Sequence, residues 1–438
     1  MATKKLSAQS TDSIKNELTI AAQIRPRFEM RDGAFKPLNK NEKPATLISQ
    51  RSRITIDYVY KNVLSIRISP QSVSIWGQAN TVQGVENSGN RIGIFETWAK
   101  LQISKNWNLK MGRQVISLDD ERFFGELDWA QGGRAHDALA IQYEKNKFNV
   151  KGFLAYNQNY KSLYNNNINN PAGNLYSTND AFSYKLMQTI WTGFTVGKKS
   201  TLSFLVTNLG LQHADSITAN PTTFYSQTFG ANYMGKGKKI TGNVSAYFQS
   251  GKNNLGNTTE AYLLAASVNY PFTKKWNAGL GSDWVSGNKV GIPQTNNRSF
   301  NPYFHTGHKF YGAMDYFYVG SSHKNAGLSD NYISLQYKPE KNNIIQVAIH
   351  QFFSTAKVVS GTKSISKNLG QEMDFSYSHK LNSFSNIVGG YSFFLPTSTL
   401  KYLKNSSVDN RFPQWAWLSI NITPTILKNY YSQNKFEK

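Results

Sequence analysis

The stretch that decides the fold spans residues 53–69 and reads Arg53-Ile54-Thr55-Ile56-Asp57-Tyr58-Val59-Tyr60-Lys61-Asn62-Val63-Leu64-Ser65-Ile66-Arg67-Ile68-Ser69. Large apolar side chains occupy every second position on both sides of the Lys61-Asn62 pair, and mainly polar ones occupy the positions between them. Because successive side chains of a strand point to opposite faces, this period of two predicts two β-strands joined by a tight turn. Each strand would have one apolar face and one polar face.

The same alternation recurs along the chain, for example over residues 18–25 and 138–144, and helical spacing is sustained nowhere. Short turns rich in Lys and Asn alternate with long loops rich in Gly, Asn and Ser. The turns lie at residues 61–62, 105–106, 145–147, 197–199, 235–239, 273–275, 338–342 and 380–382. These eight turns and the nine long loops around them predict about eighteen strands. Short turns at one rim and long loops at the other are typical of an all-β, antiparallel, transmembrane barrel of the outer membrane.

A barrel of this size would use almost the whole chain. We expect an N-terminal periplasmic segment at residues 1–16, the barrel at 17–427 and a C-terminal periplasmic tail at 428–438. The N-terminus has no apolar segment of a secretory signal, so we interpret the sequence as a mature form located in the outer membrane of a Gram-negative bacterium. A soluble propeller or sandwich is the alternative, but the chain lacks blade-like repeats and its loops differ in length between the two ends.

The composition excludes several classes of function. The net charge of +23 and the pI of about 9.7 would suit a nucleic-acid-binding protein, but the excess lysines lie in turns rather than along one face. Without cysteine there is no disulfide, no thiolate metal site and no cysteine nucleophile. No Ser, His or Asp lies in a recognisable nucleophile motif, so we expect no enzyme. Eight tryptophans near strand ends, at 76, 98, 107, 191, 276, 284, 415 and 417, suggest aromatic girdles at the membrane surfaces.

Arginines on the polar faces of neighbouring strands are the main candidates for a functional site. A guanidinium that faced lipid would cost roughly 2–4 kcal/mol, so the polar faces should line the lumen. The lumen would then carry Arg25, Arg27, Arg51, Arg53 and Arg67, with Glu29, Asp57 and Glu96 beside them and a second acidic pair at Glu372 and Asp374. One interpretation is an electropositive lumen that selects anions. The other is that these ions only brace the barrel wall.

A charge-rich stretch at residues 112–137 lies between two predicted strands. It holds Arg113, Arg122 and Arg134 with six carboxylates, at Asp119, Asp120, Glu121, Glu126, Asp128 and Asp137. Unpaired buried charges are costly, so we expect a loop that dips into a wet lumen and acts as a filter or gate. Asp128 and Asp137 would position arginines. Arg113 shares the parity of Leu109 and Met111, so it reaches the lumen only if a bulge intervenes. The carboxylates could instead bind Ca²⁺, but no EF-hand spacing supports this, and we expect no cofactor or metal.

Several blocks of the sequence resemble the alginate export porin family of Gram-negative outer membranes. They include Arg25-Pro26-Arg27-Phe28-Glu29, Arg51-Ser52-Arg53, Gly112-Arg113-Gln114, Asp120-Glu121-Arg122-Phe123-Phe124-Gly125, Leu127-Asp128-Trp129, Gly133-Arg134-Ala135-His136-Asp137, Gly307-His308-Lys309-Phe310-Tyr311-Gly312-Ala313-Met314-Asp315 and Leu369-Gly370-Gln371-Glu372-Met373-Asp374. The resemblance covers about residues 17–425 and implies an eighteen-stranded barrel with an arginine-rich lumen that passes an anionic polyuronate. The high Asn, Lys, Tyr and Phe content suggests a Bacteroidetes-type member.

Together these features predict a passive, anion-selective porin, surrounded by outer-membrane lipid and lipopolysaccharide and expected to be a monomer. The solute would be an alginate-like polysaccharide, another anionic glycan or a small anion, and no nucleic acid. The long loops at 117–134 and 287–327 would fold in or over the mouth, with His308, Lys309, Tyr311 and Asp315 as gate candidates. The alternative is a non-conducting barrel, plugged by its loops, that serves as an accessory subunit of a larger outer-membrane complex.

Overall fold

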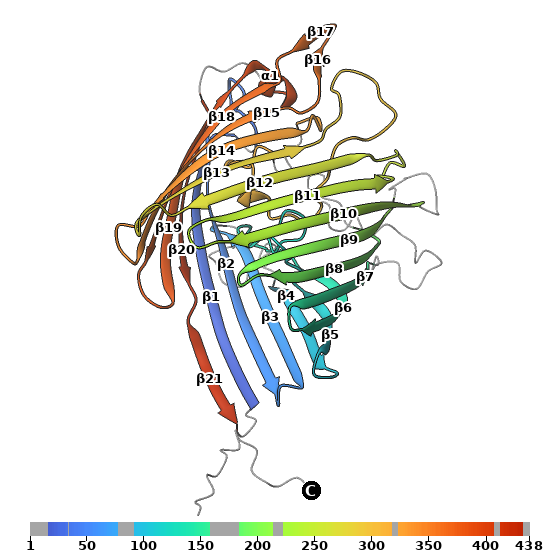
Figure 1. Ribbon diagram of the computed structural model, residues 1–438. Helices are drawn as coiled ribbons and strands as arrows, with labels where there is room; N and C mark the ends of the chain where they lie inside the picture. Colours follow the sequence, from blue (N-terminus) through green and yellow to red (C-terminus); the bar gives the residue numbers. More distant parts are fainter. Residues whose placement is uncertain are drawn as a thin grey trace, which may run out of the picture.

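The computed structural model describes residues 16–33, 35–77, 92–157, 184–212, 222–317, 323–406 and 412–431. Long antiparallel strands form a barrel (Figure 1). The wall consists of β1 (Asn16–Arg31), β2 (Ala45–Tyr60), β3 (Leu64–Ile75), β4 (Ile92–Gln102), β5 (Trp107–Gln114), β6 (His136–Lys145), β7 (Phe148–Tyr156), β8 (Leu186–Val196), β9 (Ser200–Gln212), β10 (Thr223–Lys236), β11 (Thr241–Gly251), β12 (Ala261–Tyr270), β13 (Trp276–Val285), β14 (Leu328–Tyr337), β15 (Asn343–Phe353), β18 (Asn368–Lys380), β19 (Ser385–Pro396), β20 (Gln414–Ile422) and β21 (Thr425–Tyr431).

The barrel closes because β1 pairs with β2 on one side and with β20 and β21 on the other. Every other wall strand pairs with its neighbours in chain order. β20 and β21 are two parts of one pass, interrupted at Thr423 and Pro424, where proline cannot donate a ladder hydrogen bond. The nineteen-stranded sheet of the described residues is therefore a closed barrel of eighteen passes, and the predicted fold is confirmed.

Both ends of the barrel sequence meet at the rim of short turns. Asn16 of β1 pairs with Tyr431 of β21, and the Asn16 side chain accepts a hydrogen bond from the Lys61 N–H in the β2–β3 turn. The strand therefore continues to Tyr431, four residues beyond the end that the sequence suggested at 427. All seven side chains of β21 are exposed. Neither face of β21 is buried, so the alternation that marks the other strands is absent there.

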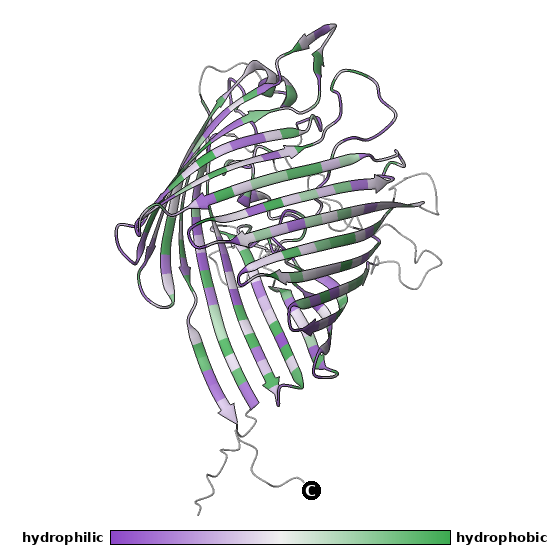
Figure 2. Ribbon diagram, viewed as in Figure 1, coloured by the Kyte–Doolittle hydropathy of each residue, from purple (hydrophilic) through white to green (hydrophobic). Residues whose placement is uncertain are grey.

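The outward face of the barrel is apolar. Ile190, Leu280 and Ile333 are more than half exposed, whereas residues of opposite parity on the same strands, such as Trp191, Gly281 and Asp283, are buried. Figure 2 shows this alternation as bands of opposite hydropathy along the strands. Exposing such an apolar surface to water would be unfavourable, whereas contact with lipid is not. No helix in the described part of the chain is long and apolar enough to cross a membrane.

The tryptophans divide between the two faces, which corrects the expectation of aromatic girdles. Trp76, Trp107 and Trp284 are exposed, whereas Trp191 and Trp415 are buried and Trp98 and Trp417 contact charged or aromatic groups of the interior. These four tryptophans lie inside the barrel because each occupies an inward-facing position of its strand, in the same alternating set as polar residues. Two small elements lie in the long loops, namely the hairpin of β16 (Val358–Ser360) and β17 (Lys363–Ile365) and the helix α1 (Ser398–Leu403).

Candidate functional site

The β5–β6 loop, residues 115–135, crosses the interior of the barrel. At one end of the crossing Asp128 contacts Arg25 of β1 and Arg51 of β2. At the other end Asp119 accepts hydrogen bonds from Trp191 of β8 and Ser203 of β9, and Arg122 forms an ion pair with Asp283 of β13. The loop thus touches strands on opposite parts of the wall.

Apolar side chains explain why this charged loop folds inward. Phe123 and Phe124 are 1% exposed, and Ile116 and Leu118 are also buried. Phe124 stacks on Phe304 of the β13–β14 loop with ring centroids 5.1 Å apart. Burying a phenylalanine side chain contributes about 1.5–3 kcal/mol. A loop in solvent would forgo that stabilisation, so the two phenylalanines favour docking inside the barrel.

The described parts of the β13–β14 loop, residues 286–317 and 323–327, include a segment that folds inward and joins the first loop. The Gly125 N–H donates to the Phe304 carbonyl at 2.8 Å, and the Thr306 N–H donates to the Glu121 carbonyl at 3.1 Å. The Met314 N–H donates to the Glu372 carboxylate of β18 at 2.7 Å. The Ala313 N–H lies 3.4 Å from Asp374. The acidic pair of β18 therefore anchors the second loop to the wall.

The gate candidates of the second loop lie at its junction with the first. His308, in the short 3-10 turn η3 (Gly307–Lys309), stacks on Trp129 with centroids 4.0 Å apart and lies 3.1 Å from Asp315. Lys309 lies 3.5 Å from Glu121. Tyr311 is buried among the aromatic side chains. His308 and Lys309 hold the two loops together, and Tyr311 lines a cavity of about 330 Å³ inside the second loop.

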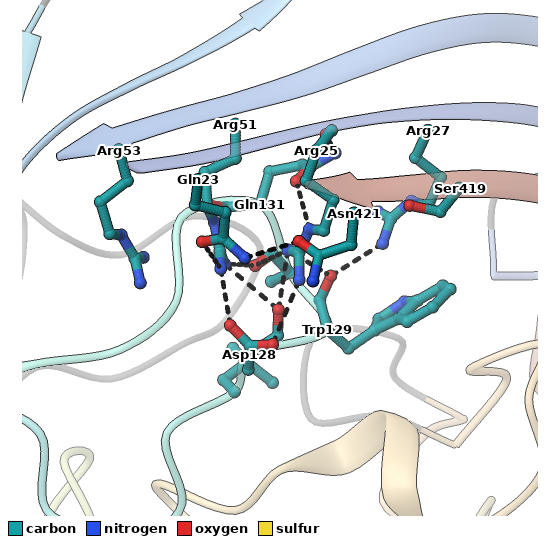
Figure 3. A network of polar contacts seen from close by, with 12 residues as sticks. Gln23, Arg25, Arg27, Arg51, Arg53, Asp128, Trp129, Gln131, Ser419 and Asn421 are labelled. Carbon is teal, nitrogen blue, oxygen red and sulfur yellow. Dashed lines mark hydrogen bonds and ion pairs between the residues drawn. The ribbon is translucent and has the colours of Figure 1, made fainter. Parts of the chain in front are cut away.

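Three arginines hold the first loop by its backbone, and we call Arg25, Arg27 and Arg51 the arginine clamp. Figure 3 shows them reaching from β1 and β2 to the segment 128–131. Arg51 donates to the carbonyls of Gln131 and Ala130, each at 2.6 Å. Arg25 donates to the Asp128 carbonyl at 2.8 Å, and Arg27 donates to the Trp129 carbonyl at 2.7 Å. Four consecutive carbonyls accept from the clamp.

The Asp128 side chain completes the clamp. Its two oxygens lie 2.6 Å from Arg51 and 3.2 Å from Arg25. Arg51 is fully buried, whereas the Asp128 side chain is 54% exposed. Burial acts to raise the pKa of Asp128, but the hydrogen bond and charge of Arg51, with the charge of Arg25, hold it below its ordinary value. The carboxylate is therefore ionised at neutral pH, and its contribution to docking is lost only as the pH falls below about 4.

Arg53 and Arg67 differ from the clamp. Arg67 forms two hydrogen bonds with Asp57, at 2.7 and 3.0 Å, and a third with Glu96 at 3.0 Å, so two carboxylates neutralise it. Arg53 donates only to the Gln71 side-chain oxygen and stacks on Phe95. Within the described ranges no carboxylate lies within ion-pair distance of Arg53. Of the five arginines predicted on the inward faces of β1 to β3, Arg53 is thus the one without a carboxylate partner among the described residues.

Two further predicted site residues, Glu29 and Arg134, make contacts that support the structure. Glu29 pairs with Arg27 at 2.9 Å and with Arg31 at 3.1 Å. Arg134 donates to the carbonyls of Phe304 and His305 and so joins the two loops.

Arg113 and Asp137 lie where β5 and β6 meet the β5–β6 loop, and both border a cavity of about 400 Å³ beside Gly133 and Arg134. They pair with each other at 2.8 Å at the rim of the long loops. The register between β4, β5 and β6 shows no shift there, so Arg113 keeps the outward parity of Leu109 and Met111. The bulge that would turn Arg113 inward is absent from these strands.

Sequence reasoning missed a second group of lumenal cations, which we call the lysine strip: Lys100 of β4, Lys110 of β5 and Lys151 of β7. Lys100 and Lys110 are direct cross-strand partners. Lys110 lies 4.1 Å above the Trp98 ring, and Lys151 lies 5.0 Å from the Trp191 ring. No carboxylate in the described part of the chain lies within 4 Å of the three ammonium groups. Like charges placed opposite each other destabilise a sheet, so a structural role does not explain the strip.

A cavity of about 350 Å³ is bordered by Arg53 and by Lys110 of this strip. Its wall includes three cations and three carboxylates, namely Arg53, Arg67, Lys110, Glu96, Glu126 and Asp128. Glu96 is paired with Arg67. Burial, and then the charge of Asp128, raise the pKa of Glu126 above its ordinary value. Asp128 is paired with the clamp, so among the described residues of this wall Arg53, Lys110 and Glu126 are the charged groups without an ion pair, two of them cations and one a carboxylate.

Several of the loop carboxylates have their own cationic partners. Asp120 pairs with Arg122 at 2.8 Å, Glu121 with Lys309, and Asp128 with the clamp. No group of three or more His, Asp or Glu side chains suited to a metal ion occurs among the residues that the structure describes. The arrangement favours the interpretation that these carboxylates position arginines.

Acid should loosen the second loop through His305. Burial, and then the charge of Arg134, lower the pKa of His305 to about 3, whereas a free histidine titrates near about 6.5. The undocked loop then binds a proton that the docked loop does not, so docking is fully stable above about pH 7 and weakens as the pH falls from about 6.5 toward 3. The protection of amides over residues 300–317 against hydrogen exchange in detergent, corrected for the intrinsic pH dependence of exchange, should fall between about pH 7 and pH 5. His305→Asn should remove that change, and His379→Asn, at the rim of short turns, should not.

The closed barrel, its apolar outward face and its inward loops define a porin-like barrel of the outer membrane. Solved structures with this fold include Pseudomonas aeruginosa OccK5 (OpdH), 9% identical, with a TM-score of 0.62 over 94% of this chain and 98% of that chain. Acinetobacter baumannii OccAB1 is 12% identical, with a TM-score of 0.61 over 94% and 97%. At these identities the likeness establishes the fold alone.

The chain belongs to the alginate export family, whose model matches residues 16–414. No curated protein matches the sequence.

Proposed function

We propose that this protein is a passive, anion-selective channel of a Gram-negative outer membrane, which passes an acidic polysaccharide or its oligouronates. The observation that carries the proposal is the set of lumenal cations without a carboxylate partner, Arg53 with the lysine strip. Arg53 and Lys110 line a cavity of the lumen, and cations that line an aqueous pore attract anions at little desolvation cost. The family match supports an acidic glycan as the solute.

The position of the cations supports uptake of the glycan from the periplasm. Lys110 and Lys151 are each the fourth residue after a short turn, and Lys100 is the third residue before one. Short turns face the periplasm in barrels of this type. A polyanion that approaches from that side meets the strip before it reaches Arg53 and the loops.

The chemistry of the strip fits repeating carboxylates. A carboxylate of the glycan can move from one cation to the next when the cations lie on neighbouring strands. The glycan can then pass without binding tightly at any one site. Trp98 and Trp191 add aromatic surfaces beside Lys110 and Lys151. No single lysine needs to bind strongly.

Block of ion current by acidic oligosaccharides tests the proposal. An oligouronate added on the side of the short turns should reduce the current of single channels in a planar bilayer, because its carboxylates occupy the lumenal cations. A neutral oligosaccharide of the same length should reduce it less. Equal block by both sugars would contradict an electrostatic filter. A barrel that never conducts would favour the plugged accessory subunit, which the inward loops make a real alternative.

A further inference from the structure

Phe95 occupies a β-bulge at the edge of the lumen. Ser69 of β3 pairs with Glu96 of β4, but the next residue, Pro70, pairs with Ile94, so Phe95 is the extra residue. Pro70 has no N–H to donate, which suits a ladder interrupted at this point. As a result the side chains of two successive residues both contact arginines of the barrel interior: Glu96 binds Arg67, and the Phe95 ring lies against Arg53.

The Phe95 ring fills the space between the barrel wall and the first loop. The Arg53 guanidinium carbon lies 3.6 Å from the ring centroid. On the loop, a Cβ at Gly133 would lie 2.6 Å from the ring carbon Cε2, and Gly133 has a φ of 66°. Both facts require glycine there. The ring thus touches β2 and the β5–β6 loop at once.

Two cavities meet at Phe95. The outer cavity, of about 400 Å³, lies toward the long loops, and its wall includes Gln71, Gly132, Arg134, Phe304 and the Arg113–Asp137 ion pair. The inner cavity is the one described above, with Arg53 and Lys110. Of the described residues that line the two cavities, Phe95 alone belongs to both walls.

We propose that Phe95 is the gate of the anion path, closed while its ring stacks on Arg53. This inference rests on the proposed function and assigns the control of that path to one side chain. A carboxylate that binds Arg53 neutralises the guanidinium and weakens its attraction to the ring. The ring then rotates and the inner cavity opens to the outer one. Side-chain rotation is fast, so this opening needs no release of the clamped loop.

The gate predicts that Phe95→Ala raises the conductance of single channels severalfold and leaves the preference for anions intact, because Arg53 and the lysine strip remain. Phe310→Ala is the matched control: Phe310 also stacks on an arginine, at 4.1 Å from Arg122, but lines neither cavity. Its conductance should equal that of the wild type. Phe95→Leu keeps the apolar packing of the bulge without the aromatic face, and it should also raise conductance.

The outcomes separate the gate from the proposed function. If the wild type conducts anions and both Phe95 variants conduct as the wild type does, the gate is refuted and the anion path stands. If the Phe310 variant gains as much conductance as the Phe95 variants, the effect comes from loosened loops, and the gate is likewise refuted. If the wild type and all variants fail to conduct although circular dichroism shows a folded barrel, the proposed function itself fails.

Discussion

Arg51→Gln is expected to release the β5–β6 loop from the wall and to give large, fluctuating currents through single channels. Arg51 is fully buried and holds the carbonyls of Ala130 and Gln131 together with the Asp128 carboxylate. Breaking a buried ion pair costs about 3–5 kcal/mol, and the low end applies because Asp128 is half exposed. A loss of about 3 kcal/mol lowers the ratio of docked to undocked loop more than about a hundredfold.

Arg53→Gln is the matched control for the clamp. Arg53 lies two residues along the same strand and shares the inward face of Arg51, but it makes no contact with the carbonyls of segment 128–131 (Figure 3). Its replacement should weaken anion preference and leave the current steady. Limited proteolysis of the loop gives a second measurement: the Arg51 variant should be cut faster than the wild type, and the Arg53 variant should not. If both variants were cut equally fast, this would contradict the claim that Arg51 holds the loop whereas Arg53 serves anion selectivity.

The second large effect is expected from the triple variant Lys100→Gln, Lys110→Gln and Lys151→Gln. It removes three unpaired lumenal charges and one repulsive cross-strand pair. Anion preference should fall strongly or vanish. The barrel should be at least as stable as the wild type, because like charges opposite each other are removed. Thermal unfolding in detergent and the zero-current potential across a salt gradient measure the two effects.

Lysines of the turns supply the control for the triple variant. Lys145, Lys198 and Lys274 lie in or beside short turns, and their replacement by Gln removes the same formal charge. Their charges are exposed at the rim and screened by salt, so selectivity should change much less. A similar shift in both triple variants would show that overall charge, and not the strip, sets the preference.

The barrel could be predicted from sequence because two of its signals are local. Alternation such as Ile54, Ile56 and Tyr58 assigns faces, and the spacing of short turns assigns the order of strands. Both signals fail at β21, where Lys428 and Tyr430 share a face and no side is buried.

The division of the arginines could not be predicted, because it depends on a contact across about a hundred residues of chain. Nothing near Arg25 or Arg51 in the sequence shows that the carbonyls of 128–131 will meet them. The apolar pair Phe123 and Phe124 inside a charged loop is the signal that could have indicated an inward fold. The loops predicted at 80–91 and 158–181 lie outside the described residues.

The lysine strip could have been found from parity. Trp98 and Lys100 alternate with Ala99 and Leu101, so the period of two already places Lys100 on the lumenal side. Lysine was associated with turns because most lysines of this chain lie there. Phe95 was hidden for a different reason, because a bulge reverses the parity on which the reasoning depends.

The zero-current potential of the wild type in a planar bilayer with a KCl gradient tests the central claim most directly. The unpaired cations Arg53, Lys100, Lys110 and Lys151 predict a zero-current potential of the sign that a chloride-selective channel gives. In the triple lysine variant this potential should move toward zero. A wild-type potential of the sign set by potassium, or one that the lysine changes leave unaltered, would contradict the claim.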